Sequence, residues 1–343
     1  MIVNAQGNGN GVRLRPWRLI GVIICCAAIF LVATTMYSAH RIPKSVAAFH
    51  FFGTILVLGW IDNHRALIWD TNGTFVLDID KRTRTNIVTP KSWHQAFDAV
   101  IAVSPDGQTV GGLDAAGNQW TVSTSSVLRG QARNSATINA LKQFIWFPDG
   151  NRSSIFEDHI TNPNKPNPYY LYSGHGPRTL IKVGQMASPW QAVGAMSNGQ
   201  ILIVDDYDVS TRGPYLAAAN PSTGNVTPLN ASWPPRKAQW SANGSNMIPD
   251  FALSPQGDRL ACTIMTEYSR PLALAGLKPP QPYSLYVGDT SGNHWQLAAT
   301  FDRLPDNPRW LPDGKHLSVR LISGSFEKGT AQYDLAVVAI TRD

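Results

Sequence analysis

The chain has 343 residues, which is enough for one large domain or two modest ones. Hydrophobic residues make up 43% and charged residues only 15%, so a sizeable core can form, and 24 prolines, 28 glycines and 11 tryptophans favour short strands joined by tight turns. The net charge of +6 includes no run of five like charges, which argues against nucleic acid as a partner.

The first element along the chain is an apolar segment. Residues 19–37 contain no charged side chain and are mostly Ile, Val, Leu, Ala and Phe. As a helix these 19 residues would span about 29 Å, which matches the roughly 30 Å hydrocarbon core of a bilayer. We therefore predict a short cytoplasmic tail at 1–18, a transmembrane signal-anchor helix at 19–37 and a linker at 38–45.

A cleavable signal peptide is the alternative interpretation of this segment. Such a peptide needs small residues at the −3 and −1 positions, whereas Met36 or Tyr37 falls at −3 here. Three arginines precede the apolar segment and two basic residues follow it, so we expect the N-terminal flank to stay in the cytoplasm. The expected location is the cell membrane, with a single pass and an extracytoplasmic C-terminal domain, either periplasmic or extracellular.

A recurring turn is the strongest signal in the rest of the chain. Three copies end in Pro-Asp-Gly, one ends in Pro-Gln-Gly and two are degraded, at 104–107, 147–150, 311–314, 254–257, 196–199 and 60–63. Their third positions are 43 to 58 residues apart, which is the length of one propeller blade. Proline presets φ, Asp bonds its own backbone and Gly takes the left-handed position, so each copy predicts a tight turn between two strands.

These repeats resemble the WD40-like (PD40) repeats of TolB-type propellers, in which an apolar residue precedes Ser-Pro-Asp-Gly and an apolar strand follows. Trp146 and Trp310 precede two of the turns in this sequence. The resemblance implies an all-β fold over residues 46–343, a six-bladed β-propeller. With the apolar segment described above, the expected fold is this propeller preceded by one N-terminal transmembrane helix. Because such repeats occur in proteins with unrelated tasks, they indicate the fold far better than the function.

Apolar runs between the turns place the remaining strands. The fourth strands are expected at 86–89 in blade one and at 294–298 in blade five. Blade six ends with a third strand at 333–340 and has no fourth strand after it. We expect residues 46–52 to supply that strand and close the ring, because closure removes the open edges of the sheets.

The connections between second and third strands all leave a propeller at one face. They are short in blades one and two and long in blades three to six, which indicates a lopsided binding surface, although surfaces also tolerate neutral loop growth. Tyr and Arg are enriched at binding hot spots. The candidate partner-contact residues on or beside these connections are Tyr169, Tyr170, Arg212, Tyr215, Tyr268, Arg270, Lys278, Tyr283, Phe326 and Lys328.

The central channel should be lined near the start of each first strand, by Gln143, Asp250 and Asn307. No histidine occupies these positions, whereas propeller enzymes need acids and histidines there to hold a metal or transfer protons. The acidic cluster at 205–208 lacks the glycine-turned loop of a calcium site, and Cys262 is the only cysteine after residue 26, which leaves no thiolate zinc site. We therefore predict no catalytic residue, metal or cofactor.

Two functions remain open at this point. The first is a membrane-anchored scaffold that binds a protein or peptide partner through the face with the long connections. The second is a channel-centred enzyme or small-ligand sensor for a sugar or lactone, with or without a metal. No nucleophile elbow, zinc-binding helix or phosphate-binding loop occurs, so the non-enzymatic scaffold is the prediction that we adopt.

Overall fold

The structure is a computed structural model. It describes residues 47–90, 93, 101–114, 118–133, 142–158, 168–172, 178–181, 190–205, 215–232, 250–265, 283–324 and 331–340, all within the unit Pro43–Asp343. The tail, transmembrane helix and linker that the sequence predicts lie outside these residues. Within them, no helix is both long enough and apolar enough to cross a bilayer.

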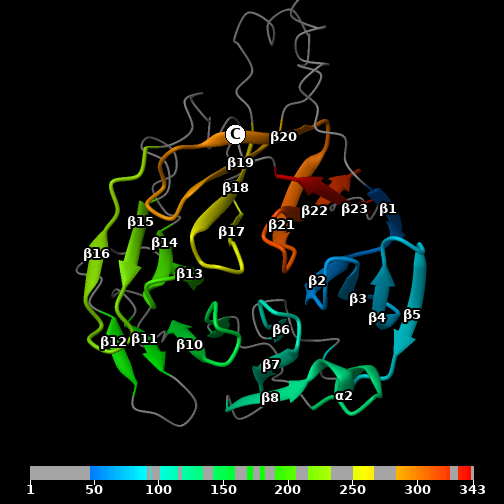
Figure 1. The fold of residues 1–343 in the computed structure, drawn as a ribbon, viewed down its shortest axis with the longest axis horizontal. Coiled ribbons are helices and arrows are strands. Elements are labelled where there is room, and N and C mark those ends of the chain that lie inside the picture. The colour runs from blue at the N-terminus through cyan, green and yellow to red at the C-terminus, as the bar shows by residue number, and fades with distance from the viewer. Residues whose placement is uncertain are drawn as a thin grey trace, which may run out of the picture. The chain divides into compact units, whose positions relative to one another are not determined.

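Six antiparallel sheets follow one another around a common centre, which confirms the predicted six-bladed β-propeller (Figure 1). We call the sheets blades one to six and count the strands of each blade outward from the centre. Blade one consists of β2 (Ile55–Trp60), β3 (Arg65–Asp70), β4 (Gly73–Asp78) and β5 (Thr83–Ile87), and blade two of β6 (Ile101–Val103), β7 (Thr109–Leu113) and β8 (Gln119–Ser123). Blade three consists of β9 (Lys142–Trp146), β10 (Ser153–Asp158), β11 (Tyr169–Tyr172) and β12 (Thr179–Ile181), and blade four of β13 (Trp190–Ala195), β14 (Ile201–Asp205), β15 (Tyr215–Ala219) and β16 (Val226–Pro228). Blade five consists of β17 (Phe251–Leu253), β18 (Arg259–Met265), β19 (Tyr283–Asp289) and β20 (Gln296–Phe301), and blade six of β21 (Leu304–Trp310), β22 (His316–Ser323), β23 (Gln332–Ala339) and β1 (Ala47–Phe52).

The N-terminal strand closes the ring, as predicted. β1 pairs antiparallel with β23, in a register that runs from Ala47 opposite Val337 to Phe52 opposite Gln332. The last blade therefore takes its fourth strand from the opposite end of the chain. This pairing covers the outer edge of β23 and links the two ends of the propeller within one sheet.

Two predicted fourth strands need correction, because the turn before each of them is placed differently. In blade one the strand is Thr83–Ile87 rather than 86–89, since Arg82 adopts a φ of 54° and reverses the chain early. In blade five it is Gln296–Phe301 rather than 294–298, since His294 has a φ of 52° and belongs to the turn. The existence of both strands was predicted correctly, but their bounds were not, because a left-handed turn residue cannot be recognised from the apolar runs.

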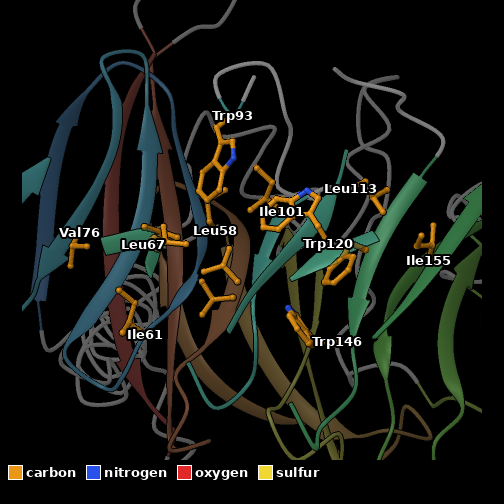
Figure 2. Packing of buried hydrophobic residues seen from close by; sticks show 14 of the residues in the cluster. Leu58, Ile61, Leu67, Val76, Trp93, Ile101, Leu113, Trp120, Trp146 and Ile155 are labelled. Carbon is orange, nitrogen blue, oxygen red and sulfur yellow. The ribbon is translucent and has the colours of Figure 1, made fainter. Parts of the chain in front are cut away.

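Blade two differs from the others, since three of its strands are described and a short helix, α2 (Thr124–Leu128), follows β8. The Ser123 side chain accepts a hydrogen bond from the Ser126 backbone and caps the helix. Trp93, which is fully buried, stacks on Trp120 with ring centroids 6.0 Å apart. Both indoles belong to the apolar cluster shared by blades one to three (Figure 2).

Every first strand that ends in a turn glycine uses the same turn. The glycine N–H donates to the carbonyl oxygen three residues earlier, over 2.8 to 3.0 Å, and the glycine φ is left-handed. These glycines are Gly107, Gly150, Gly199, Gly257 and Gly314, with φ of 74°, 68°, 81°, 67° and 61°. The predicted turn chemistry is thus confirmed in five blades.

Neighbouring turns also pack on one another. A Cβ atom added to Gly107 would lie 1.8 Å from the carbonyl oxygen of Ile61 in the blade-one turn. The Asp313 N–H of blade six donates to the Asn63 side chain of blade one over 2.9 Å, and the Ser197 N–H of blade four donates to the Gly257 carbonyl of blade five over 2.9 Å. The turns therefore join neighbouring blades as well as neighbouring strands.

Indole side chains at the ends of three first strands link adjacent blades. Trp146 Nε1 donates to the Ala102 carbonyl of blade two over 3.0 Å, and Trp310 Nε1 donates to the Ala252 carbonyl of blade five over 3.1 Å. Trp60 Nε1 donates to Ser318 Oγ of blade six over 3.0 Å. Because each indole also packs in the apolar core between two blades, a single residue supplies both apolar burial and a directional bond.

The strand directions define two faces of the propeller. First strands end, and second strands begin, at what we call the turn face, where the glycine turns lie. First strands begin at the opposite face, and because the strands are antiparallel, the connections from second to third strands also leave from there. We call this opposite side the mouth face.

Substituting two turn glycines separates backbone strain from close packing. We expect Gly199→Ala to cost about 1 kcal/mol, because its φ is 81° but nothing lies within 4 Å of the added Cβ. We expect Gly107→Ala to cost about 1–3 kcal/mol more, because the added methyl group overlaps the Ile61 carbonyl. Chemical denaturation of the two variants measures both losses, and equal losses would show that the turn-to-turn contact does not matter.

Three turn aspartates make stability depend on acidity. Burial alone would raise the pKa of Asp62, Asp149 and Asp313, but bonds from the backbone N–H groups and the basic side chain that follow each of them lower that pKa. Their contribution is therefore complete above the unfolded pKa of 3.8 and is lost as pH falls through the lower folded pKa. A triple Asp→Asn variant should lose less stability than the natural chain between about pH 5 and about pH 3, as denaturation at each pH would show. If the free energy of unfolding falls equally with pH in both chains, this assignment is contradicted.

Candidate binding channel

A cavity of about 470 Å³ lies at the centre of the propeller. Residues of all six blades line it, mainly from the first strands, which lie innermost in Figure 1. Its volume is in the range of small-molecule sites, about 300–1,000 Å³. The cavity can therefore hold a small ligand or the tip of a polypeptide segment.

The two ends of the channel differ in chemistry. At the turn face the lining contains the prolines of four turns and three indoles, namely Pro105, Pro148, Pro255, Pro312, Trp60, Trp146 and Trp310. Toward the mouth face, where first strands begin, the lining contains amides and charged groups, namely Gln143, Gln191, Asp250, Asp306, Asn307 and Arg320. A ligand that enters from the mouth face would meet polar groups first and apolar groups deeper inside.

The polar lining that the structure describes lies on one side of the channel. All six of these polar residues belong to blades three to six, whereas the lining residues described in blades one and two are Trp60, Ala102, Ser104 and Pro105. Blades three to six are also the blades with the long connections between second and third strands. The polar wall and the strand ends that the long connections join thus belong to the same four blades and the same face.

Gln143 bridges two blades and still presents a donor to the channel. Its Oε1 accepts the backbone N–H of Ala192 over 2.7 Å, which ties blade three to blade four. Within the part of the chain that the structure describes, its Nε2 group has no hydrogen-bond partner. A half-buried amide held at one end and open at the other is well placed to donate to a ligand carbonyl.

Asp250 holds an irregular stretch of the neighbouring blade. Its Oδ2 accepts the backbone N–H of Asn307 over 2.8 Å. Asn307 has a φ of 47° and lies in a bulge between Asp306 and Arg309. The carboxylate therefore stabilises a left-handed residue in the channel wall. Asp250 has this structural role whether or not it also contacts a ligand.

Asp306 and Arg320 form a bidentate ion pair in the same wall. Arg320 Nε and Nη2 donate to the two carboxylate oxygens over 2.6 Å each, and both side chains are largely buried. Arg320 Nη1 also donates to the Ile55 carbonyl of blade one, and the guanidinium lies 5.4 Å from the Tyr333 ring centroid. Pairing cancels these two charges, so amides account for much of the remaining polarity of this wall.

The described chemistry around the channel offers no strong nucleophile or metal-ligand set. Cys262 lies behind the wall and is fully buried, and burial, followed by the Asp250 charge, raises the pKa of its thiol well above the ordinary value. Among the residues with described positions, no three His, Cys, Asp or Glu side chains gather closely enough to hold a metal ion. The acidic cluster at 205–208 lies outside the described residues after Asp205.

The structure brings the three predicted channel residues, Gln143, Asp250 and Asn307, into one cavity wall. Gln191, Asp306 and Arg320 line the same wall and were not predicted from the sequence. Gln143, Asp250 and Asn307 each lie seven positions before a turn glycine, whereas Gln191 lies eight positions before Gly199 because of the bulge between Ala192 and Gly194. An alignment of the repeats that allows a one-residue insertion in the first strand would have predicted Gln191.

Few of the predicted partner-contact residues can be placed. Tyr169 is corrected, because its ring is 2% exposed and stacks on Phe156 at 5.5 Å, so it belongs to the core between blades three and four. Tyr170 and Tyr283 are half-buried, and Tyr215 lies at the start of β15. The other predicted contacts lie outside the described residues, namely Arg212, Tyr268, Arg270, Lys278, Phe326 and Lys328.

Comparisons with known proteins found likeness in structure only. No family model matches the chain, and a search of curated proteins returned no match. A protein assigned as TolB from Agrobacterium tumefaciens is similar in structure, with 12% identity, a TM-score of 0.49, and coverage of 84% of this chain and 91% of the other. TolB from Acinetobacter baumannii is similar at 14% identity, a TM-score of 0.44, and coverage of 89% and 68%.

A fungal alcohol oxidase in complex with copper is also similar, at 9% identity, a TM-score of 0.47, and coverage of 88% of this chain and 77% of the other. Likeness at these identities and TM-scores says nothing of function. The class that the fold defines is a six-bladed β-propeller. The six-bladed fold that the resemblance of the repeats implied is confirmed by the six sheets of this chain.

Two variants of Asp250 measure how much its hydrogen bond to Asn307 stabilises the fold. We expect Asp250→Ala to lower the free energy of unfolding by about 1–3 kcal/mol, because the Asn307 N–H loses its acceptor. Asp250→Asn retains an oxygen acceptor and should cost less. Denaturation midpoints of the two variants test this, and an Asp250→Ala chain as stable as the natural one would contradict it.

Proposed function

We propose that this chain is a non-enzymatic binding scaffold that receives a polypeptide partner at the mouth of the channel. One observation carries the proposal, which is that the polar wall of the channel and the long connections belong to the same four blades and the same face. The polar wall of the channel and the connections at the mouth face would together enclose a partner segment from several sides. Propellers commonly bind partners through connections of one face.

The chemistry of the wall favours a polypeptide over a strongly charged ligand. Gln143, Gln191 and Asn307 carry side-chain amides, which can donate to a peptide carbonyl and accept from a peptide N–H. The Asp306–Arg320 pair is internally neutralised and so offers little net attraction to an anion or cation. Prolines and indoles deeper in the channel would suit an apolar side chain at the tip of the segment.

The proposal includes a location. We propose that residues 19–37 anchor the chain in the cell membrane and that the propeller is extracytoplasmic. The uncharged apolar stretch and the basic residues before it support this arrangement. A scaffold tethered in this way would bring its partner to the membrane without acting on it chemically.

Site-specific photo-cross-linking in native cells tests the binding function. The full chain carries p-benzoylphenylalanine either at Gln191, on the mouth side of blade four, or at Asn198, in the turn of the same blade, and both positions are exposed. We expect a discrete polypeptide adduct at position 191, because that side chain borders the polar wall, and none at position 198. Mass spectrometry of the adduct identifies the partner segment.

A second substitution tests whether the adduct at position 191 depends on the channel wall. Gln143→Ala removes the channel-facing amide, together with the acceptor of the Ala192 N–H next to position 191, and it should weaken the adduct at position 191 several-fold. Equal adducts at 191 and 198 would contradict a mouth-face site. A retained small molecule in native mass spectra that is lost in Gln143→Ala, with no polypeptide adduct, would favour the alternative of a small-ligand sensor.

A further inference from the structure

The central cavity is wide enough for one polypeptide chain. Its lining follows β13 from Gln191 to Ala195, and five strand residues extend over about 17 Å. A volume of about 470 Å³ over that length gives a mean cross-section of about 28 Å², which is a circle about 6 Å across. A hairpin of two chains about 4.8 Å apart and an α-helix about 10–12 Å wide are both too broad for this cavity.

The first strand of blade five presents its backbone to this cavity. β17 is the innermost strand of its blade (Figure 1), and the residues from Asp250 to Pro255 line the cavity without a break. Successive side chains of a strand point to opposite faces of the sheet, so side chains alone would give every second residue. The unbroken run therefore indicates that the edge of the strand, with its N–H and C=O groups, borders the cavity.

Hydrogen bonds on either side of Leu253 show which backbone groups face the cavity. The Ser254 N–H donates to a carbonyl at the start of β18 over 2.9 Å, and the Asp250 carbonyl accepts an N–H of β18 over 3.1 Å. Bonded and non-bonded pairs alternate along an antiparallel ladder, so Leu253 belongs to a non-bonded pair. Its N–H and C=O therefore point away from β18, and they have no hydrogen-bond partner within the described part of the chain.

Side chains of the channel wall already bind backbone groups of the inner strand edges. The Ala192 N–H of β13 donates to Gln143 Oε1 over 2.7 Å, and the Asn307 N–H of β21 donates to Asp250 Oδ2 over 2.8 Å. In both contacts a side-chain oxygen takes the place that a peptide carbonyl would have in a sheet. The inner edges of these first strands are thus within reach of an acceptor that lies in the channel.

From this geometry we infer that the partner enters the channel as one extended chain and is recognised through its backbone, as an added strand beside β17. The inference rests on the proposed function and specifies the form of the partner. Leu253 donates to a carbonyl and accepts from an N–H of the partner, and Gln143 Nε2 donates to another carbonyl. Because every residue except proline offers both backbone groups, the bound segment has no proline at the paired position and is otherwise tolerant in sequence.

Two cross-linking positions at opposite ends of the channel test the extended form. The full chain carries p-benzoylphenylalanine in native cells either at Gln191, at the mouth face, or at Pro255, at the turn face. The two positions are separated by about the length of a first strand, which an extended chain covers with about five residues and a helix with about eleven. Tandem mass spectrometry identifies the attached residue of the partner in each adduct. We expect both labels to attach to one polypeptide, at residues fewer than eight positions apart.

Each outcome separates the inference from the proposed function. A polypeptide adduct at position 191 alone, with both labelled chains folded, would overturn the inference and leave the scaffold intact. Adducts on two different polypeptides, or attached residues eight or more positions apart, would do the same. Absence of any polypeptide adduct at position 191 would remove the scaffold and the inference together.

A proline in the inner edge tests the backbone contact itself. Leu253→Pro removes the N–H that faces the cavity and leaves the ladder bonds to β18 in place, whereas Leu253→Val shortens the side chain and keeps the N–H. We expect the adduct at position 191 to be several-fold weaker in the proline variant than in the valine variant. Equal adducts in the two chains would overturn the inference. Thermal unfolding establishes that both variants are folded, and the spacing of the attached residues decides the question if the proline variant is not.

Discussion

The turn that follows each first strand is the constraint on which the propeller depends. In five blades a left-handed glycine donates its N–H to the carbonyl three residues earlier, which reverses the chain within four residues and sets the register of the first strand pair. The turns also contact one another, as between Gly107 and Ile61 and between Asp313 and Asn63. A local backbone preference therefore contributes to the assembly of the whole ring, because the same residues form the turn and the contact between blades.

The residues of the channel wall serve the fold as well as any ligand. Gln143 holds a backbone N–H of blade four, Asp250 holds one of blade six, and Arg320 reaches a carbonyl of blade one. Buried polar groups of this kind are costly unless they are bonded, so the wall is built from groups that satisfy one another across blade boundaries. A partner that bonds these groups would act on the same contacts that join the blades, and binding would thereby be linked to the rigidity of the ring.

The closing strand joins the two ends of the domain and at the same time gives the propeller two unlike faces. β1 begins at the turn face, and the long connections of blades three to six begin and end at the mouth face. The turn face thus carries the local charge pairs of the turns, and the mouth face carries the polar end of the channel. This difference between the two faces follows from the direction of the strands.

The repeat and the closing strand could be predicted from the sequence because turn chemistry is local: proline, aspartate and glycine act on their own backbone, and their spacing counts the blades. Gln143, Asp250 and Asn307 were predicted for the same reason, since each holds one position relative to its turn. Tertiary structure decided the rest. Gln191 was displaced in the repeat by a bulge, Asp306 meets Arg320 only across paired strands, and Tyr169 became a core residue because a neighbouring blade covers it. Such contacts join residues that are distant along the chain, so they exist only once the blades have packed together.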